Sequence, residues 1–384
     1  MTGPAFAEGR SFHVPSFRIE LEGRDLSRTV VADVLEVTFT DSLDAIHSFE
    51  LNLYDWDPVG LRPRYSSPWD ADGRPLRVQG AAVPDFEPGA RVALCFGYLD
   101  DGELPLVMKG EVVSISPSFP ATGSPTCRVR ALDGLLRRMQ RTRVTDNGGG
   151  TDKQIVDRLC QGHVTVRWEG PESEGDARKN VEIDGMLYDE VFKRAQGYGL
   201  SMTTEPDGSA LTLGRPAAAR TAPVATLEWG RTLLSFTPAL STAGQYSEVV
   251  VRAADPDAQA GRRQIEVTRT WKDVGLKPSA LGPAGAAGLD AAVRGVPLVI
   301  KPADVRTRAD AEKAGDKKLQ ELAADLIKGS GSSLGLPELR AGRIVTMAGL
   351  GARFDGEYRL TRTTHSFGAS GYTTTFDARK EVLD

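Results

Sequence analysis

The sequence has few of the residues from which disulfide frameworks, metal sites and catalytic centres are usually built. It contains only 3 cysteines and 4 histidines among 384 residues. The cysteines are odd in number and far apart: Cys95, Cys127 and Cys160. This pattern disfavours a disulfide framework and is typical of a protein that folds in a reducing compartment.

The histidines are equally scattered, at His13, His47, His163 and His365. None has the spacing of a metal ligand to another histidine or to a cysteine, so we expect no metal site and no cofactor. Residues 70–73, DADG, begin like a calcium loop but lack its later ligands, and a surface turn is the favoured interpretation. His365 is interpreted as a sheet or turn residue.

Catalytic motifs are missing as well. The chain has no GxSxG, no HExxH and no GxxxxGK followed by Ser or Thr. Glycines 329, 331 and 335 follow a predicted helix rather than a strand, which favours a linker over a phosphate-binding loop. A carboxylate pair for glycoside hydrolysis does not stand out among 52 acidic residues. We therefore predict no catalytic, cofactor-binding or metal-ligating residue.

Long apolar runs and a strong charge of one sign are also absent. No run approaches the length needed to span a bilayer, and the N-terminus lacks the apolar segment of a secretory signal. The net charge is −5, and basic pairs such as Arg137-Arg138 lack interleaved aromatics. We expect synthesis and assembly in the cytoplasm, no membrane insertion and no nucleic-acid partner.

What the chain does contain is alternation of apolar and polar residues. Residues 1–137 are predicted to form a first β-domain. Segment 16–23 places Phe17, Ile19 and Leu21 on one side of a strand. Five further strands are predicted at 34–41, 48–55, 91–98, 103–114 and 127–132. Short connections between many strands favour a sandwich or barrel.

Residues 138–225 change character and are predicted to form a small α+β domain. Thr151 with Gln154 three residues later is a capping-box pattern, so a helix is expected over 151–162. A second helix is expected over 185–199, followed by a hairpin that turns at Pro206-Asp207-Gly208.

Residues 226–384 are predicted to form a second β-barrel domain with an inserted loop and helix at about 272–336. Segment 272–305 is rich in Gly, Ala and Pro, and we expect it to be a long loop or extension and the most mobile or partner-dependent part of the isolated chain. A helix is expected over 307–329, capped by Thr307 and ended by Gly329. The stretch that follows, as far as residue 342, is predicted to be a linker.

Three echoes indicate that the two β-domains are duplicates. Residues 110–131 and 356–378 both begin with Gly-Glu, pass through Ser-Phe and end in Ala. Residues 86–92 likewise parallel 339–345, and residues 48–58 resemble 246–256. The predicted fold class is therefore mainly β with α+β insertions: two related β-barrel domains with a small α+β domain between them.

Several of these segments resemble a known family. The pattern LRAGRIVTMAGLGARFDGEYRLTRTTHSFGASGYTTTFDA at 339–378, together with GRTLLSFTP at 230–238, resembles baseplate hub proteins of contractile phage tails. That family is the phage late control protein D family, which includes the N-terminal part of VgrG proteins of type VI secretion. The helix and hairpin region at 151–214 fits the same resemblance, and the first β-domain fits it more weakly.

The resemblance implies a structural function without enzymatic activity. Three chains with two tube-type barrels each would form a homotrimeric, pseudo-hexameric adaptor between a hexameric inner tube and a trimeric spike. Expected partners are the inner tube or tube-initiator protein, a separate OB-fold or β-helical spike protein and other baseplate subunits. Because the chain stops at Asp384 without an OB-fold or needle, the spike is expected to be a separate subunit.

Two other classes of function stay open at this point. One is a particle-associated cell-wall (peptidoglycan) hydrolase, which would need clustered catalytic residues. The other is a carbohydrate-binding β-protein, which usually displays aromatics on one sheet face. The 5 tryptophans are dispersed, at positions 56, 69, 168, 229 and 271, and this weighs against the second class.

Overall fold

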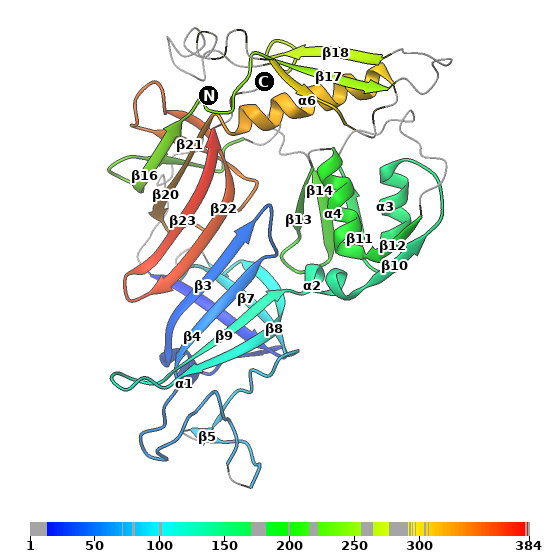
Figure 1. Ribbon diagram of the computed structural model, residues 1–384. Helices are drawn as coiled ribbons and strands as arrows, with labels where there is room; N and C mark the ends of the chain where they lie inside the picture. The colour runs from blue at the N-terminus through cyan, green and yellow to red at the C-terminus, as the bar shows by residue number, and fades with distance from the viewer. Residues whose placement is uncertain are drawn as a thin grey trace.

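The N-terminal and C-terminal parts of the chain together form one thirteen-stranded sheet, and a small α+β domain packs beside it (Figure 1). The computed structural model describes residues 14–70, 72–78, 81–99, 102–169, 182–198, 200–214, 222–254, 264–275, 291, 293, 295, 297–302, 305, 307–380 and 382. The predicted fold class, mainly β with α+β insertions, is confirmed.

The large sheet consists of two halves with the same strand order. The first half-barrel contains β1 (Pro15–Leu21), β3 (Val34–Ser42), β4 (Ser48–Tyr54), β7 (Arg91–Tyr98), β8 (Leu106–Ser118) and β9 (Thr126–Asp133). The second half-barrel contains β15 (Ala225–Glu228), β16 (Leu233–Leu240), β20 (Ile327–Leu334), β21 (Ile344–Ala348), β22 (Gly356–Gly368) and β23 (Gly371–Lys380). Their orders are β1-β7-β8-β9-β4-β3 and β15-β21-β22-β23-β20-β16.

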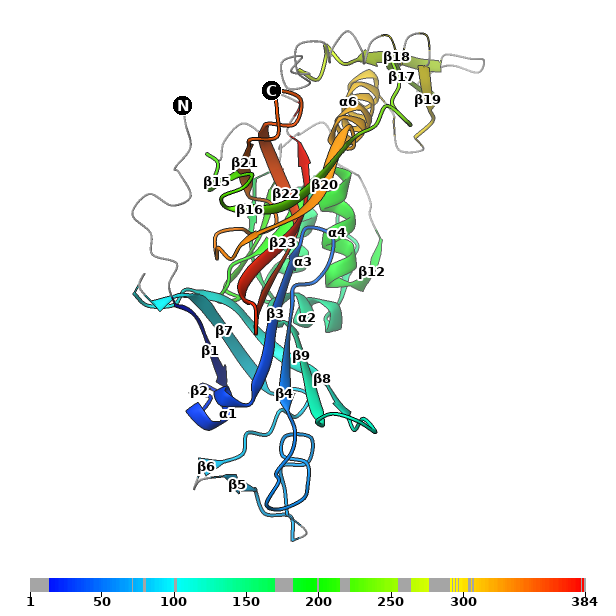
Figure 2. The same ribbon diagram turned by 90° about the vertical axis from the view of Figure 1, so that its left-hand side faces the viewer.

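When the six strands of each half are numbered in chain order, their order across the sheet is 1-4-5-6-3-2 in both halves. The polarity differs only at one edge, where β1 is antiparallel to β7 but β15 is parallel to β21. The two halves join where β22 pairs with β3 in antiparallel fashion (Figure 2). The small strand β2 (Arg24–Asp25) and the short helix α1 (Arg28–Ala32) follow β1.

The backbone hydrogen bonds of the two halves match residue by residue. Gly89 and Gly342 both have positive φ, 102° and 86°, where a side chain would be strained. Their amides donate to the carbonyls of Val112 and Leu360 at 2.8 and 2.7 Å. Directly after Val112 and Leu360, both hairpins contain a β-bulge. These shared features confirm the echo between residues 86–131 and 339–378.

The register corrects two details of the predicted repeat. Val92 pairs with Gly110, whereas its counterpart Val345 pairs with Tyr358. The predicted match of Gly110 with Gly356 is therefore wrong by two residues, although both hairpins share Gly-Glu in sequence.

The proposed echo of residues 48–58 in 246–256 is also wrong. Strand β4 lies in the large sheet, whereas β17 (Glu248–Ala254) lies in a separate three-stranded sheet. The counterpart of β4 is β20, because Phe49 pairs with Ala131 and Gly329 pairs with Ala378. A short alternating strand that ends at Asp-Pro is too common a pattern to identify an equivalent position.

Strand β20 lies where the sequence predicts the end of a helix and a linker, so that prediction is wrong. A Cβ on Gly331 would lie 2.4 Å from the carbonyl oxygen of Ser235, and one on Gly329 would lie 2.7 Å from that of Thr237. The two backbones approach too closely for a side chain at either position. The close packing of β20 against β16 therefore requires glycine at these two positions. The local sequence pattern does not indicate this requirement.

Helix α6 (Arg308–Ala324) accordingly ends earlier than predicted. Thr307 caps it as expected and forms a capping box with Asp310. The helix packs on a sheet of β18 (Gln264–Thr270), β17 and β19 (Pro297–Ile300). The sheet and α6 lie at the end of the molecule away from the first half-barrel (Figure 2). Strand β19 interrupts the loop predicted over 272–305, and residues 276–290 of that loop lie outside the described residues.

The α+β domain begins at α2 (Gly134–Arg141), directly after β9. It contains β10 (Arg143–Asp146), α3 (Asp152–Cys160), β11 (Thr165–Trp168), β12 (Ile183–Met186), α4 (Leu187–Gly197), β13 (Ser201–Thr204) and β14 (Ala210–Gly214). The predicted capping box of Thr151 and Gln154 is confirmed, and so is the hairpin between β13 and β14. Leu187, Val191 and Ala195 form the buried side of α4.

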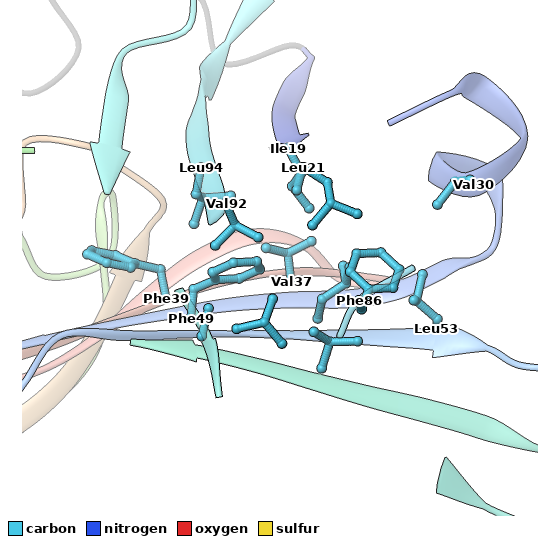
Figure 3. Close-up of a cluster of buried hydrophobic side chains, with 14 of the residues drawn as sticks. Ile19, Leu21, Val30, Val37, Phe39, Phe49, Leu53, Phe86, Val92 and Leu94 are labelled. Atoms are coloured by element: carbon cyan, nitrogen blue, oxygen red, sulfur yellow. The ribbon is translucent and has the colours of Figure 1, made fainter. Parts of the chain in front are cut away.

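The first half-barrel has an apolar core, shown in part in Figure 3, which also includes Phe367 and Tyr372 of the second half-barrel. Phe39, Phe49 and Leu94 are at most 1% exposed and come from β3, β4 and β7. The second half-barrel packs around Tyr358 and Leu360 of β22, which are both fully buried. Beyond the first half-barrel, the loop between β4 and β7 extends outward and contains the two-residue strands β5 (Arg77–Val78) and β6 (Ala81–Ala82).

Candidate functional site

The most unusual side chains of the described residues gather where the two half-barrels and the α+β domain meet. Asp41, near the end of β3, is only 3% exposed, yet two cationic groups contact it. Its carboxylate accepts a hydrogen bond from the guanidinium of Arg340, in the connection between β20 and β21, and one from the Ala341 amide at 3.2 Å. The ring Nε2 of His47 lies 2.9 Å from the other carboxylate oxygen.

Arg340 thus reaches from the second half-barrel into the first. Its guanidinium also lies 4.9 Å from the centre of the Phe39 ring, and it donates to the carbonyl of Val107 at 3.5 Å. Planar guanidinium groups suit such combined contacts with a carboxylate, an aromatic face and a carbonyl. One side chain therefore fixes β3, β8 and the β20–β21 connection relative to one another.

His47 extends the network into the α+β domain. Its Nδ1 lies 3.4 Å from the hydroxyl oxygen of Thr204 in β13. That hydroxyl donates its hydrogen to Asp133 at 3.0 Å, which leaves its oxygen free to accept from His47. Asp133 also caps α2 by accepting from the Leu136 amide at 2.9 Å. All three parts of the chain are thereby connected by charged or polar contacts.

The protonation states follow from these contacts. Burial alone would raise the pKa of Asp41, but the charges of Arg340 and His47 outweigh it and hold that pKa below its usual range. Burial also acts to lower the pKa of His47, and the Asp41 carboxylate overcomes this and raises it. An ionised Asp41 between two cations is the arrangement in which each buried charge has a partner.

A second buried histidine lies close by and has the opposite preference. His365 of β22, which is 0% exposed, packs 5.0 Å from the Phe96 ring centre. Its Nε2 lies 2.8 Å from the carbonyl oxygen of Leu339, and its Nδ1 lies 2.8 Å from the Tyr372 hydroxyl. Burial and the nearby charge of Arg340 lower the pKa of His365 to about 3. The neutral ring therefore donates from Nε2 and accepts at Nδ1.

Asp41, His47 and Thr204 have the order of an acid–base–nucleophile triad, and this possibility requires an explicit test. A nucleophile must reach a substrate and be activated by the base. The Thr204 hydroxyl instead donates to Asp133, and Asp41 and His47 are only 3% and 4% exposed. The network therefore fits a joint between parts of the chain rather than a catalytic centre.

The other candidate residues do not assemble into a site. Cys95, Cys127 and Cys160 are buried, and burial raises the pKa of each thiol, which disfavours the reactive thiolate. His163 is exposed, and His13 lies outside the described residues. Across the described ranges, no group of His, Cys, Asp and Glu is arranged to hold a metal ion.

Two further surface features have simple structures. Asp70 accepts from the amides of Asp72 and Arg74 at 2.9 and 2.8 Å, which confirms the predicted turn. A shallow open groove of about 450 Å³ lies over β1, β7 and the start of β8. Arg18 donates to the Cys95 sulfur there at 3.6 Å.

In the described part of the chain, no helix is long and apolar enough to cross a bilayer.

We predict that replacing Arg340 destabilises the chain much more than replacing its exposed neighbour Arg343. Arg340→Gln removes a cationic partner of a buried carboxylate, which typically costs about 3 kcal/mol or more. Arg343→Gln is the matched control, and a surface change of this kind usually stays within about 0.5 kcal/mol. Urea unfolding measures both. Equal midpoints for the two variants would show that the junction contributes little.

The two buried histidines predict a stability maximum near pH 6.5. The lowered pKa of His365 means that its contribution is complete above about 6.5 and is lost as pH falls toward about 3. The raised pKa of His47 has the opposite effect: its contribution is complete below about 6.5 and is lost as pH rises through the folded value.

Between pH 6.5 and 4, we expect His365 to add up to about 1.4 kcal/mol per pH unit to the slope of unfolding free energy. His365→Gln should flatten this acid limb, whereas His47→Gln should flatten the limb above pH 6.5. Urea titrations at a series of pH values provide the measurement. An unchanged acid limb in His365→Gln would contradict the assignment.

Comparison with solved structures identifies the fold more widely. A 43 kDa tail protein of prophage MuSo2 from Shewanella oneidensis is 16% identical, with a TM-score of 0.66, and the alignment covers 96% of this chain and 100% of that one. A tail protein from Neisseria meningitidis is 14% identical, with a TM-score of 0.63 and coverage of 97% and 98%.

An Escherichia coli protein described as a component of the type VI secretion system, similar to the T4 tail proteins gp27 and gp5, is 12% identical. Its TM-score is 0.54, and the alignment covers 95% of this chain and 80% of that one. At such identities the likeness is one of fold.

Sequence comparison adds one match. No curated protein matches the chain. The family described as the Alg8 N-terminal domain matches residues 11–368, nearly the whole length of the sequence. The chain therefore belongs to the Alg8 N-terminal domain family.

Proposed function

We propose that the chain is the structural baseplate hub of a contractile injection system or phage tail. Three copies would form a pseudo-hexameric ring that joins a hexameric inner tube to a trimeric spike. The observation that carries the proposal is the duplicated half-barrel, because six similar units per ring then require only three chains. The narrower assignment to the late control protein D family belongs to the same proposal.

The fold likeness supports this direction. The similar solved structures are described as tail proteins and as a type VI secretion component, and two further ones come from structures of a PdpA–VgrG complex, each with a TM-score of 0.52. We accordingly propose the inner tube or tube initiator, a separate spike protein and other baseplate subunits as partners, and the particle as the place of action.

The domain division belongs to the same proposal. We propose the predicted division at residues 137 and 225, with the first boundary drawn back to the start of α2, because Leu135 and Leu136 belong to the core of the α+β domain. In this organisation the half-barrels build the ring. The α+β domain and the β17–β18–β19 sheet with α6 project from it as contact surfaces for other subunits.

The geometry disfavours the rival function, a particle-associated peptidoglycan hydrolase. Within the described residues, Asp41 and His47 of the triad-like arrangement are buried, and the Thr204 hydroxyl donates to Asp133. A glycosidase would instead need two carboxyl groups placed across an open cleft.

Deletion of the gene in the producing cell tests the proposal. We expect particles that lack the connection between tube and spike, or no assembled particles, by electron microscopy. Complementation with the intact gene should restore them. Normal tube–spike particles in the deletion strain would contradict the hub function. Release of fragments from peptidoglycan by the purified chain, lost on a single Asp, Glu or His substitution, would favour the hydrolase instead.

A further inference from the structure

The joint between the two halves of one chain uses only part of a long strand. On one side of β22, β21 pairs with Gly356–Arg359 and β3 pairs with Arg362–Phe367. The bulge between these two stretches separates the partners. One strand thus belongs to the second half-barrel at its start and holds the first half-barrel at its end.

The strand of the first half-barrel that corresponds to β22 is β8. Its stretch after the bulge has no strand partner among the described residues on the side where β22 binds β3. Strand β7 pairs with β8 only as far as Glu111, and beyond the bulge no described strand pairs with Ser114–Ser118 on that side. The equivalent of β3 in the second half-barrel is β16. It pairs with β20 alone and forms an outer edge of the sheet (Figure 1). The first half-barrel therefore exposes the β8 edge that corresponds to β22, and the second exposes the β16 edge that corresponds to β3.

We propose that these two edges bind each other between neighbouring copies of the chain: residues 114–119 of one copy pair in antiparallel fashion with residues 236–241 of the next. This inference rests on the proposed ring and specifies its interface. A ring of equivalent half-barrels requires the joint between chains to repeat the joint within a chain. A ring so closed would leave neither of these edges exposed.

The internal joint also determines the register. Ala131 and Ala378 occupy equivalent positions, and they pair with Phe49 and Gly329. Phe39 pairs with Phe49 and Pro238 with Gly329, so Pro238 is the counterpart of Phe39.

Inside the chain, His365 pairs with Phe39 and Thr364 with Thr40. Pro117 is the counterpart of His365, because Val112 and Leu360 are equivalent. Between chains, Pro117 should therefore lie opposite Pro238, and Ser116 opposite Ala239.

The side chains of the two free edges fit this pairing. Their residues on the core side are all apolar, although the single chain leaves several of them uncovered: Ile115, Pro117, Phe119, Phe236, Pro238 and Leu240. Phe119 is 57% exposed and Leu240 is 39% exposed. Their counterparts at the internal joint, Phe367 and Asp41, are buried. Pairing between chains would remove this apolar surface from water.

The two prolines predict that the joint between chains is the weaker of the two. Leu43 donates to the Thr361 carbonyl at 3.1 Å. Since hydrogen-bonded pairs alternate along antiparallel strands, His365 and Phe39 also form such a pair. Pro117 and Pro238 take their places and have no N–H to donate. The prolines also make both edges poor templates for unrelated strands.

Cysteine trapping tests the register directly. Ser116 and Ala239 are the counterparts of Thr364 and Thr40, whose hydroxyls lie 3.3 Å apart at a pair without backbone hydrogen bonds. The Cα atoms of such pairs lie about 4.5 Å apart, which suits a disulfide. We expect Ser116→Cys with Ala239→Cys, mildly oxidised in the purified full-length chain at high concentration, to form covalent dimers and closed trimers.

The matched control is Ser116→Cys with Thr237→Cys, which shifts one cysteine two residues out of register. We expect at least tenfold less covalent trimer from it, and the buried native cysteines should form none in the unmodified chain. Trimers by native mass spectrometry without the in-register disulfide would overturn the β8–β16 joint and leave the ring proposal standing. Closed covalent rings of another size would support the joint and contradict the trimeric hub. Monomers alone at the highest concentration, with no disulfide, would overturn the joint.

Discussion

The pairing of β22 with β3 is the contact on which the rest of the architecture depends. It converts two similar half-barrels into one continuous sheet and brings the β20–β21 connection against the end of β3. Arg340 and Asp41 meet only because of this arrangement, although they are 299 residues apart in sequence. The aromatic cluster around His365 fills the core side of the same joint.

Buried ion pairs usually contribute less to stability than their Coulomb attraction suggests, because desolvation opposes it. Their value here is geometric. Arg340, Asp41 and His47 connect the two half-barrels, and Asp133 with Thr204 extends the contacts to the α+β domain. In the proposed ring, small errors in the angle at each joint would add up around the closed assembly.

Local rules predicted the elements whose cause is local. The capping boxes at Thr151 and Thr307 and the alternating strands of the first half-barrel were found because neighbouring residues determine them. Strand β20 could not be predicted, because its glycines are required by the close approach of the β16 backbone and not by any local pattern.

The joint could not be predicted for a related reason. Asp41, His47 and Arg340 have no motif spacing, and only the folded sheet brings them together. The sequence indicates the duplication. Its exact register becomes clear only from the hydrogen bonds that the Gly89 and Gly342 amides donate.

The central claim is that one duplicated chain supplies two of six similar units in a ring. Cryo-electron microscopy of the assembled particle measures this most directly. We predict three copies of the chain around the axis, with joints inside chains alternating with joints between chains and all six half-barrels at similar radius. Six copies per ring, or a single copy on the axis, would contradict it.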